Sequence, residues 1–138
     1  NQEEENQILE RFRKDDPLPD LEPITSPEEI IALQEKRQDV LVEESVRDYI
    51  VRVARATREH PEIDLGASPR ATMALYQASQ AWAAINGRDY VIPDDVKDMA
   101  PPVLTHRLMI APAAQLRGRL PEQLVADIVA SVSVPVEN

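Results

Sequence analysis

The stretch Gly66-Ala67-Ser68-Pro69-Arg70 is the most informative part of this 138-residue chain. Ser68 and Pro69 predict the start of an α-helix, because serine is a favoured N-cap residue and proline is tolerated at the first helical position. Three other segments place a proline in the same way, but they continue with the acidic or amide residues that the positive end of a helix dipole prefers: 26–29, 92–95 and 120–123. Only the helix that begins after Ser68 has an arginine, Arg70, at this place.

The position of Arg70 is consistent with two roles. A cation in the first turn of an exposed helix is unfavourable by roughly 0.3–1 kcal/mol, and a salt bridge or contact with water can offset this cost. Alternatively, the free N–H groups of the first turn and the guanidinium together bind a phosphate group. The five residues alone leave both interpretations open.

The amino-acid composition and net charge of the chain exclude several classes of protein. The formal net charge is −10, which argues against a nucleic-acid-binding module because such modules carry a basic surface. The chain has no cysteine, which excludes a disulfide framework and a thiolate metal site and permits a reducing cytoplasm. The sequence contains no apolar run long enough to span a bilayer and no signal-peptide pattern.

Apolar residues recur at helical spacing along most of the chain, which predicts an all-α fold. Ser26 and Glu29 form the capping-box pattern at the start of the second expected helix. Three prolines and alternating acids between residues 16 and 26 predict an extended linker before it. Helices are expected at about 3–13, 26–38, 46–57, 69–85, 93–100 and 121–132.

The helix after Ser68 is predicted to bury one stripe of mostly small apolar residues: Ala71, Ala74, Leu75, Ala78, Ala81, Trp82 and Ile85. Gly87, after Asn86, predicts the end of this helix. Pro101-Pro102 is expected to break the next helix or to start a new turn, and Pro112 is expected to end the apolar segment that follows.

Several segments resemble, in order and spacing, the C-terminal lid of MoxR-type AAA+ ATPases. They are the run Gly66–Ala71, the alanine-rich helix that follows it, Asn86–Lys97 and Ala100–Leu108. Thr57-Arg58, eight residues before the glycine of that run, also fits. The match covers residues 43–108, and residues 3–13 resemble the last helix of the family's ATPase core. The family usually has Thr or Ser where this chain has Ile92, a loss that weakens a helix cap by about 1 kcal/mol.

The resemblance implies a small helical bundle, an AAA+ lid subdomain, with an N-terminal helix and a linker. It divides the chain into a remnant of the ATPase core, a linker with its helix, the lid, and a C-terminal helix with its tail: 1–15, 16–38, 39–112 and 113–138. It also implies that Arg70 is the sensor 2 residue, which contacts nucleotide phosphate. Arg58 and Ser68 are candidate supporting residues.

The resemblance further implies a ring-forming ATPase, expected as a hexamer, that acts as a chaperone in the cytoplasm and remodels or assembles partner proteins. The expected partners are the chain's own ATPase core, neighbouring ring subunits and an unidentified client protein, but neither nucleic acid nor a membrane. Lid motion would transmit the ATP state around the ring. A linker helix of this kind can direct sensor 2 to a neighbouring subunit's nucleotide, so action within one subunit or between two stays open.

No catalytic residue is expected in this chain. It contains no G-x-x-x-x-G-K-[ST] phosphate loop and no apolar strand that ends in paired acids, which phosphoryl transfer requires. ATP and Mg²⁺ are therefore expected to bind the ATPase core of a longer protein, and this chain alone is expected to be inactive. The start at Asn1, without an initiator methionine, suggests a piece of such a protein.

Other prominent polar residues have structural explanations. Asp94-Asp95 lies in a first helical turn, where acids favour the helix dipole. His60 and His106 are far apart and have no ligand cluster near them, so no metal site is expected. Arg58 has two readings, because a cation is favourable at a helix C-terminus, yet this residue precedes the loop that leads to Arg70.

A second hypothesis is a stand-alone acidic helical interaction module. The stretch Tyr90–Val96, an extended piece followed by Pro-Asp-Asp-Val, is also similar to histone-like dimerisation units. The acidic charge speaks against DNA as a partner but not against a protein partner.

Overall fold

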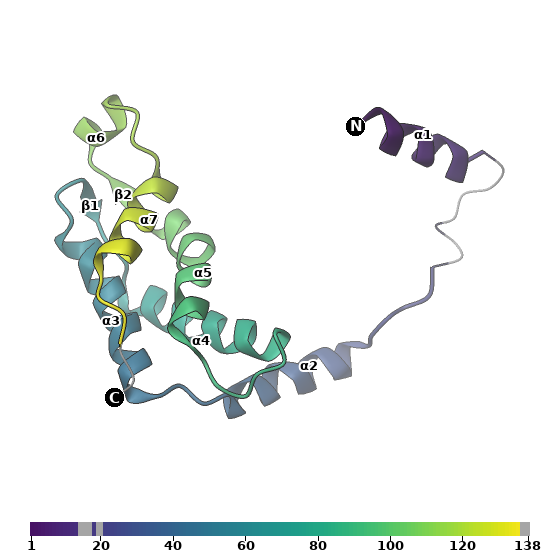
Figure 1. The fold of residues 1–138 in the computed structure, drawn as a ribbon, viewed down its shortest axis with the longest axis horizontal. Helices are drawn as coiled ribbons and strands as arrows, with labels where there is room; N and C mark the ends of the chain where they lie inside the picture. The colour runs from purple at the N-terminus through teal and green to yellow at the C-terminus, as the bar shows by residue number, and fades with distance from the viewer. Residues whose placement is uncertain (14–17, 19–20, 136–138) are drawn as a thin grey trace. The chain divides into compact units, whose positions relative to one another are not determined.

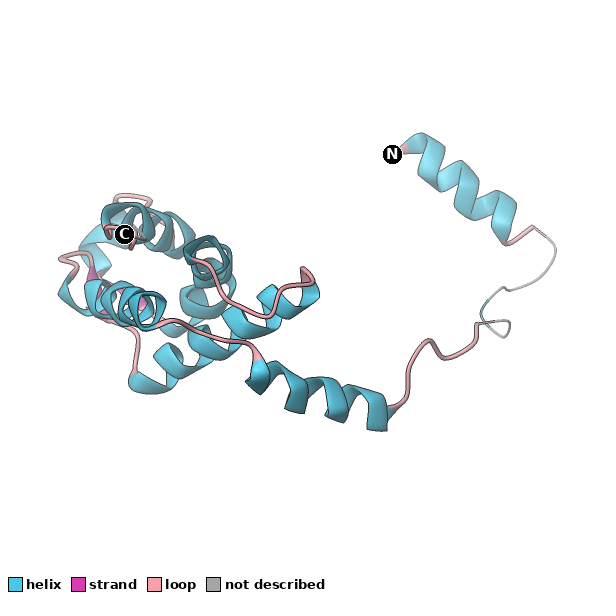
Figure 2. Cartoon of the chain, turned by 60° about the horizontal axis from the view of Figure 1, so that its bottom comes forward, coloured by secondary structure: helices cyan, strands magenta, loops and turns pink. Residues whose placement is uncertain are grey.

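The computed structural model describes residues 1–13, 18 and 21–135. The chain divides into two compact units, residues 1–33 and 34–138, and each is described by itself. Helices make up most of both units, so the all-α prediction is confirmed (Figure 1; Figure 2).

The first unit contains α1 (Gln2–Arg11), which begins at Asn1. The Asn1 side chain accepts the Glu4 N–H at 3.0 Å, as an N-cap residue does. The apolar side chains of this helix and of its C-cap residue are more than half exposed within the unit: Ile8, Leu9 and Phe12. Part of the predicted linker, 14–17 and 19–20, lies outside the described residues, and residues 21–23 form neither helix nor strand.

α2 (Pro27–Lys36) starts with the predicted capping box. Ser26 Oγ accepts the Glu29 N–H at 3.2 Å, and the Glu29 carboxylate accepts the Ser26 N–H at 2.9 Å. The bond from Ser26, with a further one from the Thr25 hydroxyl, lowers the pKa of Glu29 below its ordinary value. The capping box is therefore confirmed.

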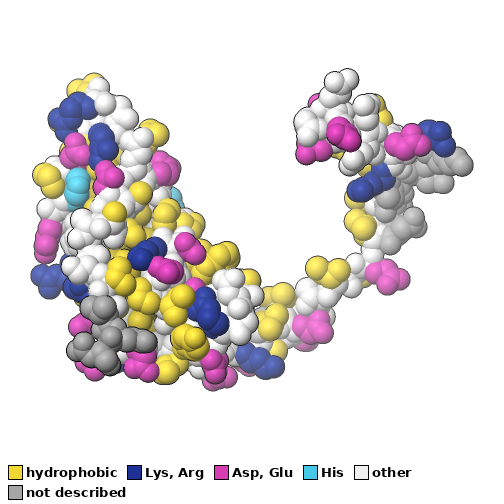
Figure 3. Space-filling view, in the orientation of Figure 1, with side chains coloured by type: hydrophobic (Ala, Val, Ile, Leu, Met, Phe, Trp, Pro, Cys, Tyr) yellow, Lys and Arg dark blue, Asp and Glu magenta, His cyan; other side chains and the backbone are white. Residues whose placement is uncertain are grey.

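The second unit is a helical bundle with a small antiparallel sheet, in which Ile63 pairs with Ile110. Its longer elements are α3 (Glu44–Glu59), α4 (Pro69–Ile85), α5 (Pro93–Leu104) and α7 (Pro121–Ser131). Its shorter ones are the 3-10 turns η2 (Arg37–Asp39) and η3 (Thr105–Arg107), strands β1 (Ile63–Leu65) and β2 (Met109–Ile110), and α6 (Pro112–Leu116). On the face seen in Figure 3, acidic and basic side chains of this unit are interspersed.

The main core lies where α3, α4, α5 and α7 pack together. All five residues that predicted the helix at 46–57 are buried: Val46, Ile50, Val53, Ala54 and Thr57. A second apolar cluster joins the sheet to α6 and α7: Ile63, Ile110, Ala114, Leu124 and Ile128. Burial of these side chains is the main stabilising contribution to the unit.

The segment Val40–Val42 is joined to the bundle by backbone and side-chain hydrogen bonds. Leu41 N–H donates to the Asp89 carbonyl at 2.8 Å, and its carbonyl accepts the Val91 N–H at 2.9 Å. The Gln80 amide donates to the Val40 carbonyl at 2.9 Å. The chain between α2 and α3 is thus attached both to α4 and to the segment before α5.

α4 buries a face that differs from the predicted stripe. Its buried residues are Ala71, Leu75, Ser79, Gln80 and Ala83, whereas Ala74, Ala78, Ala81 and Trp82 are only half-buried and Ile85 is 76% exposed. The reason is that polar side chains on this face have partners. The Ser79 hydroxyl donates to the Leu75 carbonyl at 2.9 Å, and Gln80 bonds to Val40. Polar groups that are hydrogen-bonded can be buried at little cost. The spacing of apolar residues alone therefore could not predict that Ser79 and Gln80 lie on the buried face.

The structure contradicts one of the two expectations about prolines. α5 continues through Pro101-Pro102 to Leu104, since these prolines lie in the last turn and remove only two backbone donors near the helix end. The Thr105 N–H then bonds to the Pro101 carbonyl. Pro112 follows the end of the apolar segment at Ile110, as expected, and it also begins α6, because its missing N–H costs nothing at a first helical position.

Candidate nucleotide-contact site

Arg70 is the second residue of α4, next to Pro69. The helix starts as predicted, with Ser68 Oγ accepting the Ala71 N–H at 3.3 Å. Arg70 is exposed, and it forms no hydrogen bond or ion pair with any described residue. Within the described part of the chain, no acidic residue forms the salt bridge that would explain this arginine.

The backbone at this helix start offers fewer free donors than expected. Pro69 has no N–H, Ala71 bonds to the Ser68 side chain, and the Thr72 N–H bonds to the Ser68 carbonyl at 3.1 Å. The N–H groups of Ser68 and Arg70 remain free of hydrogen bonds to described residues at this helix start. An anion bound here would depend mainly on the Arg70 guanidinium, assisted by these two N–H groups and by the helix dipole.

The loop before α4 is hydrogen-bonded to the last turn of α3. The Ala67 N–H donates to Thr57 Oγ1 at 2.8 Å, and Arg58 Nε donates to the Ala67 carbonyl at 2.6 Å. The Thr57 hydroxyl itself donates to the Ala54 carbonyl at 2.6 Å. Both backbone polar groups of Ala67, which is 1% exposed, are therefore satisfied by two consecutive residues.

Gly66 allows this close contact. A Cβ at this position would lie 2.6 Å from Arg58 Cα and 2.7 Å from both the Arg58 nitrogen and the Thr57 carbonyl oxygen. These are backbone atoms, so a side chain could fit only if the loop moved away from α3. Gly66 is required here by close packing and not by its backbone angles, because the glycines with positive φ are elsewhere, at 87 and 118.

The structure places both candidate supporting residues in contact with the segment that carries Arg70. Ser68 caps α4, and Arg58 binds Ala67, three residues before Arg70. Arg58 forms no further hydrogen bond or ion pair to a described residue. Contact of any of these residues with a nucleotide stays a prediction.

Asp94 and Asp95 have the structural roles that were expected for them. The Asp95 carboxylate accepts two hydrogen bonds from Arg88, at 2.5 and 2.7 Å, and one from the Ile92 N–H at 2.9 Å. Asp94 pairs with Lys97 at 2.7 Å. The bond from the Ile92 N–H to the Asp95 side chain is one half of a capping box; the other half, a side-chain acceptor at position 92, is missing, and the Asp95 N–H bonds instead to the Ile92 carbonyl at 3.0 Å.

The two histidines have separate hydrogen-bond partners. His60 Nδ1 accepts the Glu62 N–H at 3.2 Å, and His106 Nε2 accepts a hydrogen bond from Arg107 Nε at 3.1 Å. Throughout the described ranges, no three residues among His, Cys, Asp and Glu are grouped to hold a metal ion. No described helix is long and apolar enough to cross a membrane.

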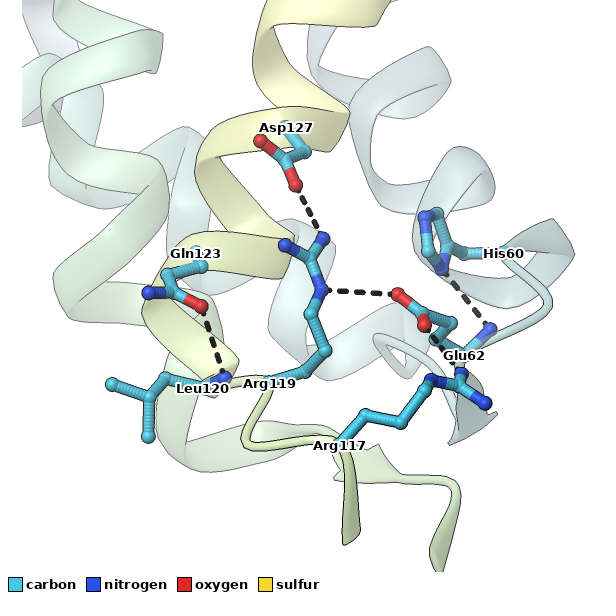
Figure 4. A network of polar contacts seen from close by, with 7 residues as sticks. All are labelled: His60, Glu62, Arg117, Arg119, Leu120, Gln123 and Asp127. Atoms are coloured by element: carbon cyan, nitrogen blue, oxygen red, sulfur yellow. Dashed lines mark hydrogen bonds and ion pairs between the residues drawn. The ribbon is translucent and has the colours of Figure 1, made fainter. Parts of the chain in front are cut away.

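A charged network near the sheet was not predicted. Glu62 accepts hydrogen bonds from Arg117 at 2.6 Å and from Arg119 at 3.1 Å, and Arg119 also binds Asp127 (Figure 4). The Arg117 hydrogen bond is the largest of the causes that lower the pKa of Glu62. More than 50 residues separate Glu62 from its partners, so no local pattern in the sequence could indicate the network.

A family model decides the class of this chain. The model of the AAA lid domain matches residues 55–128, which is more than half of the sequence and includes Gly66–Arg70. This chain belongs to the AAA lid domain family. The match also includes the stretch 90–96, so the histone-like hypothesis is not retained.

Relatives place this AAA lid domain among the MoxR-type proteins. YeaC of Bacillus subtilis is 42% identical over 98% of this chain, and the chaperone MoxR1 of Mycobacterium tuberculosis is 34% identical over 99% of it. MoxR of Methylorubrum extorquens is 34% identical over 49% of the chain and 19% of its own length. The whole chain spans only 42% of the length of YeaC and 38% of that of MoxR1. The predicted resemblance to the MoxR-type lid is thus confirmed.

A solved structure agrees with this assignment. A protein from Cytophaga hutchinsonii, described as a candidate ATPase, superposes with a TM-score of 0.87 and 27% sequence identity. The superposition covers 99% of this chain and 44% of that protein.

Proposed function

We propose that Arg70 is the sensor 2 residue of this AAA lid domain and contacts a phosphate group of ATP. The observation that carries the proposal is an exposed arginine without a partner among the described residues, held at the positive end of α4. A cation at this place is unfavourable for the isolated helix, and a bound phosphate would reverse the sign of that interaction. A guanidinium suits this role because it presents several donors to phosphate oxygens.

ATP and Mg²⁺ would be held chiefly by an ATPase core in a longer protein, and the core would supply the phosphate-binding loop and the metal ligands. The lid would add one positive charge at the phosphates. We further propose the four-part division of the chain given above, with residues 1–15 as the last helix of that core and α2 as a linker helix.

The face of α4 that carries Arg70 has features of a contact surface. A groove of about 330 Å³ between α3 and α4 is lined largely by apolar atoms, and its residues include Val51, Met73 and Tyr76. Met73, one turn after Arg70, is 62% exposed. We propose that this face packs against the ATPase core of the same subunit or of a neighbour.

The longer protein would form a ring, proposed as a hexamer, in which lid motion transmits the ATP state. Support for a chaperone role comes from the name of MoxR1, which is a chaperone. In this proposal the ring acts in the cytoplasm and remodels or assembles a partner protein.

The test is Arg70→Ala in the longer protein, with steady-state phosphate release as the readout. Loss of one charge-stabilising donor should slow turnover at least roughly tenfold. Arg55→Ala is the matched control, because Arg55 is an exposed arginine of α3 whose ion pair with Glu59 is long, at 3.6 Å. The melting temperature of Arg70→Ala should be unchanged or slightly raised, since a cation leaves the positive helix end. An unaltered turnover with a lowered melting temperature would overturn the sensor assignment.

A further inference from the structure

We infer that Thr57 and Arg58 are positioning residues that set the place of Arg70 through the backbone of Ala67. This inference rests on the proposed function of Arg70 and adds a control element to the same site. It follows from the hydrogen bonds that join the last turn of α3 to the loop before α4.

Ala67 is held at both of its backbone polar groups. Its N–H is bound by Thr57 Oγ1 at 2.8 Å, and its carbonyl is bound by Arg58 Nε at 2.6 Å. A peptide segment held on both polar groups can neither slide along α3 nor rotate about its own axis. The absence of a side chain at Gly66 brings this segment within van der Waals distance of the α3 backbone.

The chain between Ala67 and Arg70 is short and constrained. Ser68 is fixed as the cap of α4, and proline locks the φ angle of residue 69 near −65°. Few torsions therefore remain between the held residue and the Arg70 Cα atom. Fixing Ala67 fixes the start of α4 and the origin of the Arg70 side chain.

The last turn of α3, which carries Thr57 and Arg58, is itself firmly packed. Thr57 is fully buried, and its hydroxyl is oriented by a hydrogen bond to the Ala54 carbonyl. Ile50, Val53 and Ala54, on the same helix, are 1% exposed. The last turn of α3 is thus part of the packed core, and it can act as a rigid reference for the loop.

The hydrogen bond from Arg58 allows a test that separates geometry from charge. In glutamine the amide nitrogen occupies the same place along the side chain as Nε in arginine. Arg58→Gln can therefore keep the bond to the Ala67 carbonyl while it removes the charge, and Arg58→Met removes both. Thr57→Ser keeps the hydroxyl and Thr57→Val removes it.

The experiment measures phosphate release by the longer protein, together with amide hydrogen exchange at residues 66–72. Arg58→Met and Thr57→Val should speed exchange at Ala67 and lower kcat by roughly tenfold to a hundredfold, the range expected for a misplaced catalytic group. Arg58→Gln and Thr57→Ser should stay within about twofold of the parent, as should the control Arg55→Gln. In an Arg70→Ala background, Arg58→Met should cause no further loss, because a positioning residue acts only through the group it positions.

Four results would overturn the inference, and the last of them would overturn the proposed function as well. Equal losses for Arg58→Gln and Arg58→Met would show that the charge of Arg58 acts directly. An additive loss in the Arg70→Ala background would show that Arg58 acts independently of Arg70. An unchanged kcat in Arg58→Met, combined with a lowered kcat in Arg70→Ala, would leave Arg70 as sensor 2 and remove the positioning role. If Arg70→Ala itself had no effect, the proposed function would fail, and the positioning inference would fall with it.

Discussion

Arg88 and Asp95 form a bidentate ion pair across the loop between α4 and α5, with nitrogen–oxygen distances of 2.5 and 2.7 Å. The Asp95 side chain is only 3% exposed and that of Arg88 is 24% exposed. Arg88 also donates to the Tyr90 carbonyl at 3.1 Å. The pair therefore fixes the extended segment that precedes α5.

Asp95→Ala should lower the free energy of unfolding by about 2–4 kcal/mol, because it leaves the Arg88 charge and the Ile92 N–H without their acceptor. Asp94→Ala is the control. Asp94 is exposed and pairs with Lys97 at the surface, so its loss should cost less than about 1 kcal/mol. Urea denaturation of both variants measures the difference, and equal costs would contradict this account of the buried pair.

Gly66→Ala should destabilise the chain by about 1–3 kcal/mol, because the added Cβ would meet the α3 backbone at 2.6 Å. Gly87→Asn is a useful comparison. Gly87 has a positive φ of 73° but open space around its Cα, and asparagine tolerates this conformation, so the cost should be below about 1 kcal/mol. Thermal melting should rank the two variants in this order, and amide exchange at Ala67 should rise only in the first.

Leu75→Ala should cost more stability than Trp82→Ala. Leu75 is fully buried, and its truncation is expected to cost about 2–5 kcal/mol. Trp82 is half-buried, and its indole N–H reaches only Asp98, at 3.3 Å, so a loss of about 1–2 kcal/mol is expected. The reverse order in urea denaturation would mean that α4 is rotated relative to the arrangement described above.

Glu62 should contribute to the pH dependence of stability. Its pKa is lowered in the folded chain, so its contribution is present above its ordinary pKa and is lost as the pH falls through the lowered folded value. The melting temperature of Glu62→Gln should therefore fall less between pH 7 and about pH 3 than that of the parent chain. Glu59→Gln, which removes the same charge from an exposed pair with Arg55, is the matched control.

Local signals in the sequence were sufficient for several helix boundaries. The capping box of Ser26 and Glu29, the Ser68–Pro69 start and the stop at Gly87 are each set by a few neighbouring residues. The spacing of apolar residues also identified the buried face of α3, because that face carries few polar side chains.

Features that depend on distant partners could not be predicted in this way. The buried face of α4 depends on Gln80 meeting the Val40 carbonyl, 40 residues away. Strands β1 and β2 are too short to show a period of two. In the candidate site, the position of Arg70 in the first turn was predicted, but the bonds of Thr57 and Arg58 to Ala67 appear only once the loop is folded back on α3.

The attachment of Val40–Val42 has a mechanical consequence. This segment is held by the Gln80 amide and by two backbone bonds to residues 89–91, so a pull on the chain ahead of residue 40 would load α4 and the start of α5 together. In an optical trap, tension applied at residue 34 should unfold the bundle in one step, without an earlier release of residues 40–42. The segment would thus serve as a stiff tether, through which a displacement upstream in the chain moves the helix that carries Arg70.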